Sequence, residues 1–286
     1  MKLRPFELSG PSYRGALHVH TTFSDGRLSP EECCDRYRAL GFDFLFITDH
    51  DVWNDHSSLS SPGFAVFNSV EVSGSGGREH VLALGVRGAG ETGDTQRVID
   101  WTNAQGGVPV LCHPHWTRMS LRRALELGDY PLIEIWNGTS ERELSADNVH
   151  FWDLLLQEGR RVYGVADDDC HRIQDYGRGF VQVWADELSE GAILKALREG
   201  RFYSTSGPRI EVIRAGEDSL YVKAQEPMQR MALFGDGGYV GRKETLPGEM
   251  PTVSEYEVTI PGEIRSYARV AVEDRSLRRA WTQPVW

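Results

Sequence analysis

Cysteine is scarce in this chain, and long apolar runs are missing from it. There are four cysteines among 286 residues, and two of them, Cys33 and Cys34, are adjacent and therefore poor partners for each other. This pattern argues against a disulfide framework and favours a reducing compartment. No segment approaches the roughly 18 apolar residues of a membrane-spanning helix, and residues 1–15 hold no apolar run suited to a signal peptide. We therefore expect a cytoplasmic protein without a membrane partner.

Positive charge is also in short supply. The chain has 31 Lys and Arg residues against 42 Asp and Glu, a formal net charge of -11, and it has no basic stretch that could neutralise a phosphate backbone. Binding to extended nucleic acid is therefore not expected. A small anionic substrate stays compatible with this charge, because bound metal ions reverse the local field. The G-x-S-x-G motif, the P-loop and the dinucleotide-binding glycine motif are absent.

The first two thirds of the sequence alternate strand-like and helix-like segments. The clearest helix start is Ser29-Pro30-Glu31-Glu32, which combines an N-cap, a proline at the first helical position and a capping-box glutamate. We predict strands at residues 16–20, 42–48, 64–72, 80–86, 108–112, 132–136, 161–166 and 180–184, and helices at 29–41, 95–105, 121–127, 147–158 and 189–199. This alternation predicts an α/β fold with mainly parallel strands, in a closed or nearly closed barrel of about seven strands.

The character of the sequence changes after Gly207-Pro208. Short β-type runs follow, separated by turns rich in glycine, proline and acidic residues, and no helical pattern is evident. The runs lie at residues 210–213, 220–224, 230–234, 255–260 and 267–272. We predict an α/β domain at residues 1–207 followed by a small antiparallel β module at residues 208–286.

Histidines and carboxylates gather where the predicted strands end. His18 and His20 close the first strand, and because residues two apart point to the same side, both imidazoles can reach one metal ion. The other candidates are Asp25, Asp49-His50-Asp51, Glu71, His80, His113-Pro114-His115 and the run from Asp167 to His171. Each group alone is more often structural than metal-binding. The coincidence of six of the nine histidines at strand ends favours a metal site, because a parallel barrel gathers these ends on one face.

The residue types in this set indicate which metals and which chemistry to expect. Mixed imidazole and carboxylate ligands suit zinc, manganese or iron better than calcium. More than four such ligands predict two or three divalent ions, and a carboxylate such as Glu71 can bridge two of them. Paired metal ions lower the pKa of a bound water and stabilise the attacking and leaving oxygens. The set therefore predicts a hydrolase that needs no serine nucleophile.

The same segments resemble the PHP family, named for its polymerase-associated and histidinol-phosphatase members. The resemblance covers about residues 15–207 and rests on His18–Gly26, Ile47–His50, Val70–Val72 with His80–Leu82, Cys112–Pro114 and Asp169–His171. It implies a distorted seven-stranded β/α barrel with up to three metal ions at one end. The implied ligands are His18, His20, Asp25, His50, Glu71, His80, His113, Asp169 and His171, with Glu71 as the bridge. Asp25 stands where some members have histidine.

Three further segments resemble one branch of this family more closely. Ala196–Pro208, Ala166–His171 and Ala280–Pro284 resemble the branch of the family that includes carbamate-ester hydrolases. We predict a phosphoesterase that hydrolyses a small phosphate ester through a metal-activated water. A metal-dependent carboxylic or carbamate ester hydrolase is the first alternative, and a non-catalytic metal-containing binding module is the second.

Loop residues beyond the ligands are candidates for contacts with the substrate. Arg172 and Arg178 follow the last ligands, and each could hold a phosphate by a bidentate pair or pair with a nearby acid. His115 could protonate the leaving group or orient a ligand. Trp53 and Asn137 lie in loops at the same end and could line the pocket. We take His115 and Arg172 as the catalytic candidates, and Arg172, Arg178, Trp53 and Asn137 as possible substrate contacts.

Overall fold

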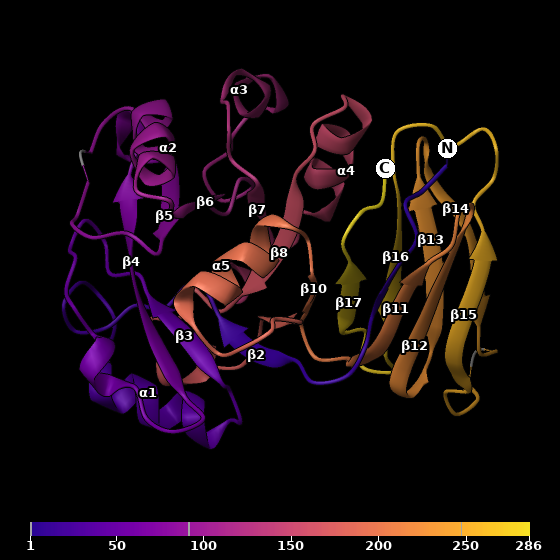
Figure 1. The fold of residues 1–286 in the computed structure, drawn as a ribbon, viewed down its shortest axis with the longest axis horizontal. Helices are drawn as coiled ribbons and strands as arrows, with labels where there is room; N and C mark the ends of the chain where they lie inside the picture. The colour runs from indigo at the N-terminus through magenta and orange to yellow at the C-terminus, as the bar shows by residue number, and fades with distance from the viewer. Residues whose placement is uncertain (1, 91, 247) are drawn as a thin grey trace.

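A computed structural model describes residues 2–90, 92–246 and 248–286 of the protein, and these form one sheet of 13 strands and one of four (Figure 1). The first part of the larger sheet runs in chain order from β2 to β8. These strands are β2 (Tyr13–Ala16), β3 (Phe44–Ile47), β4 (Ala65–Ser73), β5 (His80–Leu84), β6 (Val108–Leu111), β7 (Leu132–Asn137) and β8 (Tyr163–Asp167). Every strand predicted in this region is present, with shifted ends.

The larger sheet is mixed, and it does not close into a barrel. Parallel pairs are β2–β3, β3–β4, β6–β7 and β7–β8, whereas β5 is antiparallel to both of its neighbours. The outer edge of β2 is taken by β9 (Phe180–Val183), which returns antiparallel to it. Because β9 occupies that edge, β8 does not pair with β2, and the segments beyond these strands meet at a bridge between Val19 and Cys170 and at a bond from the Arg27 N–H to the His171 carbonyl, 3.0 Å long. The predicted seven-stranded barrel is therefore not confirmed.

Five α-helices are found among the described residues, each where the sequence predicted one. They are α1 (Pro30–Ala39), α2 (Thr95–Ala104), α3 (Leu121–Glu126), α4 (Val149–Gln157) and α5 (Glu190–Arg198). The capping box that predicted α1 is formed: Ser29 Oγ accepts from the Glu32 backbone at 3.3 Å, and Glu32 Oε2 accepts from the Ser29 backbone at 2.8 Å. Among the described residues, no helix is both long and apolar enough to cross a membrane.

The C-terminal strands are antiparallel and pack as two facing layers. They are β10 (Phe202–Thr205), β11 (Ile210–Ala215), β12 (Ser219–Met228), β13 (Arg230–Gly235), β14 (Gly238–Glu244), β15 (Val253–Thr259), β16 (Ala268–Glu273) and β17 (Arg279–Thr282). The order β1-β11-β12-β15 makes the small sheet, in which β1 (Phe6–Leu8) comes from the opposite end of the chain. Apolar side chains such as Val222 and Leu233 fill the space between the layers. The division of the chain at residue 207 stays a prediction.

Two pairings connect the C-terminal strands to the rest of the protein. β17 pairs with β10, and β10 pairs with β9, so β13, β14, β16 and β17 continue the larger sheet. The sequence did not predict β1, β10, β14 or β17. β1 has three residues and β14 carries Gly238 and Gly241, so neither shows the alternation by which a strand is recognised.

Candidate metal centre

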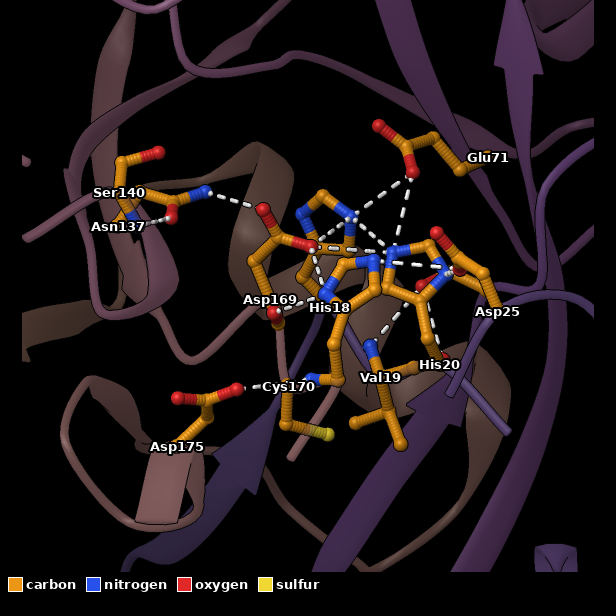
Figure 2. A network of polar contacts seen from close by, with 12 residues as sticks. His18, Val19, His20, Asp25, Glu71, Asn137, Ser140, Asp169, Cys170 and Asp175 are labelled. Atoms are coloured by element: carbon orange, nitrogen blue, oxygen red, sulfur yellow. Dashed lines mark hydrogen bonds and ion pairs between the residues drawn. The ribbon is translucent and has the colours of Figure 1, made fainter. Parts of the chain in front are cut away.

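Extended backbone beyond β2 places the two histidines of the His-x-His motif. The sequence predicted that the two histidines close the first strand. β2 instead ends at Ala16, two residues before His18, so both histidines follow the strand. The extended course continues because the Val19 backbone bonds to Thr48 Oγ1 at 2.9 Å and bridges to Cys170. Both imidazoles consequently point into the same buried space, with Nε2 of His18 and Nε2 of His20 3.0 Å apart (Figure 2).

Glu71, on β4, lies at the centre of the cluster. Its carboxylate is fully buried, and five imidazole nitrogens lie within 3.2 Å of its oxygens. Oε2 faces Nε2 of His18 (3.1 Å), Nε2 of His20 (3.2 Å) and Nδ1 of His50 (3.0 Å), while Oε1 faces Nδ1 of His80 (2.9 Å) and Nε2 of His113 (3.2 Å). Each oxygen thus has its own set of histidines, as expected for a carboxylate that bridges two cations.

Two further carboxylates extend the cluster away from Glu71. Asp169 Oδ1 lies 3.1 Å from Nε2 of His20 and 3.3 Å from Nε2 of His18. Asp25 Oδ1 lies 3.2 Å from Nε2 of His171, and the hydrogen bond from His171 lowers the pKa of Asp25 to about 2. The structure therefore brings all nine predicted ligands together, including Asp169 from the acidic run.

The backbone at two of these positions is left-handed. His113 has a φ of 24° and Asp169 a φ of 48°, in a region that residues with a side chain seldom adopt. Such conformations persist only where the surrounding structure holds them, and they concentrate at functional sites. The side chain of His113 reaches Glu71 from this backbone, and that of Asp169 reaches His18 and His20.

The donor set fits divalent metal ions. Buried imidazole nitrogens and carboxylate oxygens converge in groups whose atoms lie within 4.8 Å of one another, for example His20, Asp25, His50 and His171. Glu71 Oε2 makes no hydrogen bond although it is buried, and a buried charge is costly unless it is paired. Divalent ions between the histidines and Glu71 would neutralise the negative charge of this carboxylate. The residues present therefore suit a centre with several ions.

Glu134, on β7, supports the cluster from behind. It is fully buried, its Oε1 lies 2.6 Å from Nδ1 of His18, and its Oε2 accepts from the backbone N–H of His113 at 2.7 Å. A carboxylate on the far nitrogen of an imidazole fixes the ring orientation and leaves the other nitrogen for a metal. Sequence reasoning missed this residue, although an acid inside the apolar run Leu132–Trp136 was the signal that could have revealed it.

The other acids of the two predicted runs have different surroundings. Asp168 accepts hydrogen bonds from Tyr37 Oη and from the backbone N–H groups of residues 177 to 179. Asp49 accepts from Thr21 and Ser24. Asp167 is buried without a hydrogen-bond partner, and burial together with the nearby Glu134 raises its pKa well above the usual range. Asp168 and Asp49 therefore hold loops together, whereas Asp169 lies within 3.3 Å of two histidines and Asp167 lies 4.0 Å from Nδ1 of His18.

A cavity of about 340 Å³ opens over the candidate ligands. Besides ligand residues, it is lined by Arg27, Trp116, Thr139, Ser140, Arg142, Glu143 and Arg172. The residues from 139 to 143 belong to a short 3₁₀ helix after β7. The ring of Trp116 stands edge-on to that of His113, with centroids 5.2 Å apart. The cavity therefore has a floor of candidate ligands and a rim that carries three arginines and an indole.

The predicted substrate residues separate into two groups. Arg172 is exposed and lines the cavity. Arg178 pairs with Glu141, and Trp53 donates its Nε1 to the Val86 carbonyl at 2.9 Å; neither lines the cavity.

The remaining two predicted residues also lie outside the cavity lining. Asn137 is buried and donates to Glu134 at 3.1 Å, and it donates to Asp169 at 3.1 Å (Figure 2). His115 is exposed, and its backbone donates to Asn148.

Comparisons with known proteins place this geometry in context. No protein-family model matches the sequence. A 3′,5′-nucleoside bisphosphate phosphatase from Chromobacterium violaceum is 38% identical over 76 residues, which cover 24% of this chain and 27% of that protein. The chain thus matches about a quarter of the length of this curated relative.

One solved structure shows which fold the chain has. A two-domain protein from Bacteroides vulgatus, containing a predicted PHP-like metal-dependent phosphoesterase, aligns over 96% of this chain and 93% of its own, with a TM-score of 0.59 and 19% identity. The chain has a PHP-like fold. An amidohydrolase from Chromobacterium violaceum aligns over 66% of this chain and 96% of its own, with a TM-score of 0.49 and 19% identity. The predicted resemblance to PHP proteins is confirmed, and the resemblance to the carbamate-ester branch is not.

Proposed function

We propose that this PHP-like protein is a metal-dependent phosphoesterase that hydrolyses a small phosphate ester. The observation that carries the proposal is the arrangement around Glu71, where one buried carboxylate meets five histidines in two separate sets. The name of the curated relative, a bisphosphate phosphatase, supports phosphate as the group attacked.

The donor set suits two or three zinc, manganese or iron ions. When bound, such ions lower the pKa of a coordinated water and neutralise charge on the phosphoryl oxygens. His18, His20, His50, Glu71 and Asp169 would hold them near the floor, and Asp25 with His171 would complete the side nearer the rim. Glu134 would keep His18 in the orientation that such binding needs.

The rim residues account for substrate binding. The cavity volume of about 340 Å³ falls in the range of small-molecule sites. Arg172 reaches this cavity from the loop after β8, and its guanidinium is suited to a bidentate contact with phosphate oxygens. Protonation of the leaving group falls to a water or to His115, which is exposed but is not part of the cavity lining.

A panel of aryl esters tests the proposal. Protein loaded in turn with zinc, manganese and iron should hydrolyse aryl phosphates, and His18→Ala with His20→Ala should abolish turnover while the far-UV spectrum stays unchanged. Aryl carboxylic esters and carbamates in the same panel test the alternative bond. If the protein prefers them, it is a carboxylic or carbamate ester hydrolase and the proposal is wrong. No hydrolysis of any ester with metal bound would leave the binding-module alternative.

A further inference from the structure

A second cavity, of about 460 Å³, lies between α4 and the C-terminal strands. Its floor is one face of β13, β14, β16 and β17, and its wall is the start of α4, which lies on the side nearest these strands in Figure 1. It shares no lining residue with the cavity over the metal centre. The candidate ligands and the proposed hydrolysis therefore leave this cavity without a role.

The depth of the cavity comes from two alanines in the middle of its floor. Ala232 on β13 pairs directly with Ala271 on β16, and the row continues to Arg242 on one side and Trp281 on the other. Cross-strand partners point to the same face of a sheet. Because the two central side chains are single methyl groups, the row forms a trough between the larger side chains at its ends.

One side of the trough is aromatic. Phe234 pairs across the strands with Tyr239 and with Arg269. The Arg269 guanidinium lies 4.6 Å from the centre of the Phe234 ring and 5.0 Å from that of Trp152. Phe234, Tyr239 and Trp281, which line the cavity, offer aromatic surface against which a planar ring can pack.

The other side of the trough is rich in arginine. Glu273 lies between two guanidinium groups, 2.7 Å from Nε of Arg230 and 2.9 Å from Nε of Arg279. Arg242 pairs with Glu244 at 2.7 Å, so these arginines all have carboxylate partners. A guanidinium carries five N–H donors, and the pairs leave donors on Arg230, Arg242 and Arg279 for an anion.

Arg269 adds a buried donor without a partner. Its Nε and Nη2 bind Asp153 at 2.8 and 2.7 Å, but its Nη1 makes no hydrogen bond although it is buried. A buried polar group left without a hydrogen bond costs about 1–3 kcal/mol. A ligand with an acceptor at the edge of its ring would remove part of that cost.

We propose that this cavity binds a small organic anion that carries a planar ring. The ring would lie on Ala232 and Ala271 against the aromatic side, and the anionic group would face Arg230, Arg242 and Arg279. The volume suits a ligand of this size. The site is separate from the metal centre, so the ligand is not required to be the substrate.

Calorimetric titration of the metal-loaded protein with naphthalene-2-sulfonate tests the proposal. We expect saturable binding of one molecule per chain, at least about tenfold tighter than that of the neutral 2-naphthol or of inorganic sulfate, because both ring and charge are recognised. Ala232→Leu fills the trough and Arg242→Ala removes an exposed cation. Each should weaken binding about tenfold or more, with the melting temperature measured alongside.

Two matched variants locate the binding. Arg214→Ala removes an exposed arginine of β11 that pairs with Glu7 at 3.9 Å, and Arg172→Ala removes one from the metal-centre cavity; both should bind the sulfonate as the parent protein does. The proposal fails if no saturable binding occurs up to about 1 mM, the weak end of specific binding. It also fails if Arg172→Ala abolishes binding, or if Arg242→Ala binds unchanged.

Discussion

Oε1 of Glu134 lies 2.6 Å from Nδ1 of His18, behind the face that His18 turns toward Glu71. The pair joins β7 to the segment after β2, which are 116 positions apart in the sequence. A buried acid in this position makes His18 more basic and fixes its ring, so the readiness of the cluster to bind metal depends on a residue that would not itself contact an ion.

Glu134→Gln should weaken metal binding without unfolding the protein. The amide keeps the shape of the carboxylate but loses its charge, and losses of about 10–100-fold in metal affinity are typical for such supporting residues. Competition with a chelator, followed by metal analysis, measures the effect. Glu79→Gln is the matched control, because Glu79 pairs with Arg123 at 2.9 Å outside the cavity. Equal affinities in both variants would contradict the supporting role.

Stability of the metal-free protein should fall as the pH rises from neutral to about 10. Burial lowers the pKa of His50, but the Glu71 carboxylate, whose Oε2 lies 3.0 Å from Nδ1, outweighs this and the pKa rises from 6.5 to about 9. Protonated His50 therefore stabilises the fold fully below about pH 6.5, and this contribution is lost as the pH rises through about 9.

Chemical denaturation over this pH range measures the loss. His50→Gln should reduce the slope of the free energy of unfolding against pH. Bound metal ions take the place of the proton, so the metal-loaded protein should keep its stability over the same range. A metal-free protein whose stability does not change between neutral pH and pH 10 would contradict the prediction.

Arg172→Ala and Arg178→Ala should differ sharply, although the sequence presents both as phosphate contacts. Arg172 lines the cavity, whereas Arg178 is tied to Glu141 outside it. Loss of a charged hydrogen-bonding partner of the substrate costs about 1.5–3 kcal/mol, so Arg172→Ala should lower kcat/KM for an aryl phosphate by about 10–100-fold. Arg178→Ala should stay close to the parent. Steady-state kinetics at full metal occupancy decides between them, and similar losses would place Arg178 in the site.

Asp168→Ala should destabilise the fold by about 3 kcal/mol or more, since each buried donor left without a partner costs ~1–3 kcal/mol. The Asp168 carboxylate holds three successive backbone N–H groups and Tyr37 Oη at 2.6–2.8 Å. Asp35→Ala is the control: its pair with Arg38 is exposed and is worth less than about 1 kcal/mol. Denaturant unfolding of the two variants measures the difference, and equal stabilities would count against a structural role for Asp168.

Local sequence signals predicted the elements well, and the residues predicted as ligands lie together in the structure. The capping box at Ser29 and the spacing of His18 and His20 act over a few residues, and the structure forms both. Such local signals did not predict which strand pairs with the outer edge of β2. Whether β8 or β9 takes the free side of β2 depends on the return of the chain after Asp175, and no short pattern encodes that choice. This is why the strands from β2 to β8 were predicted, whereas the closed or nearly closed barrel was not confirmed.

Supporting residues were harder to predict than ligands, for a physical reason. Glu134 and Asn137 gain their roles from neighbours far away in the sequence, His18 and Asp169, and their own flanking residues look like an ordinary buried strand. Arg172 and Arg178 show the same limit, because only the position of Glu141 tells them apart. Pairings across the fold decide such cases.

The pairing of β1 with β11 also sets an order of events during synthesis. Phe6 lies opposite Ala215, so the strand that leaves the ribosome early has its partner among residues made some two hundred positions later. Contacts between such distant segments close late and slow the folding of a chain. Until β11 (Ile210–Ala215) is made, β1 lacks its partner strand, and an unpaired strand is a target for chaperones or for a neighbouring chain.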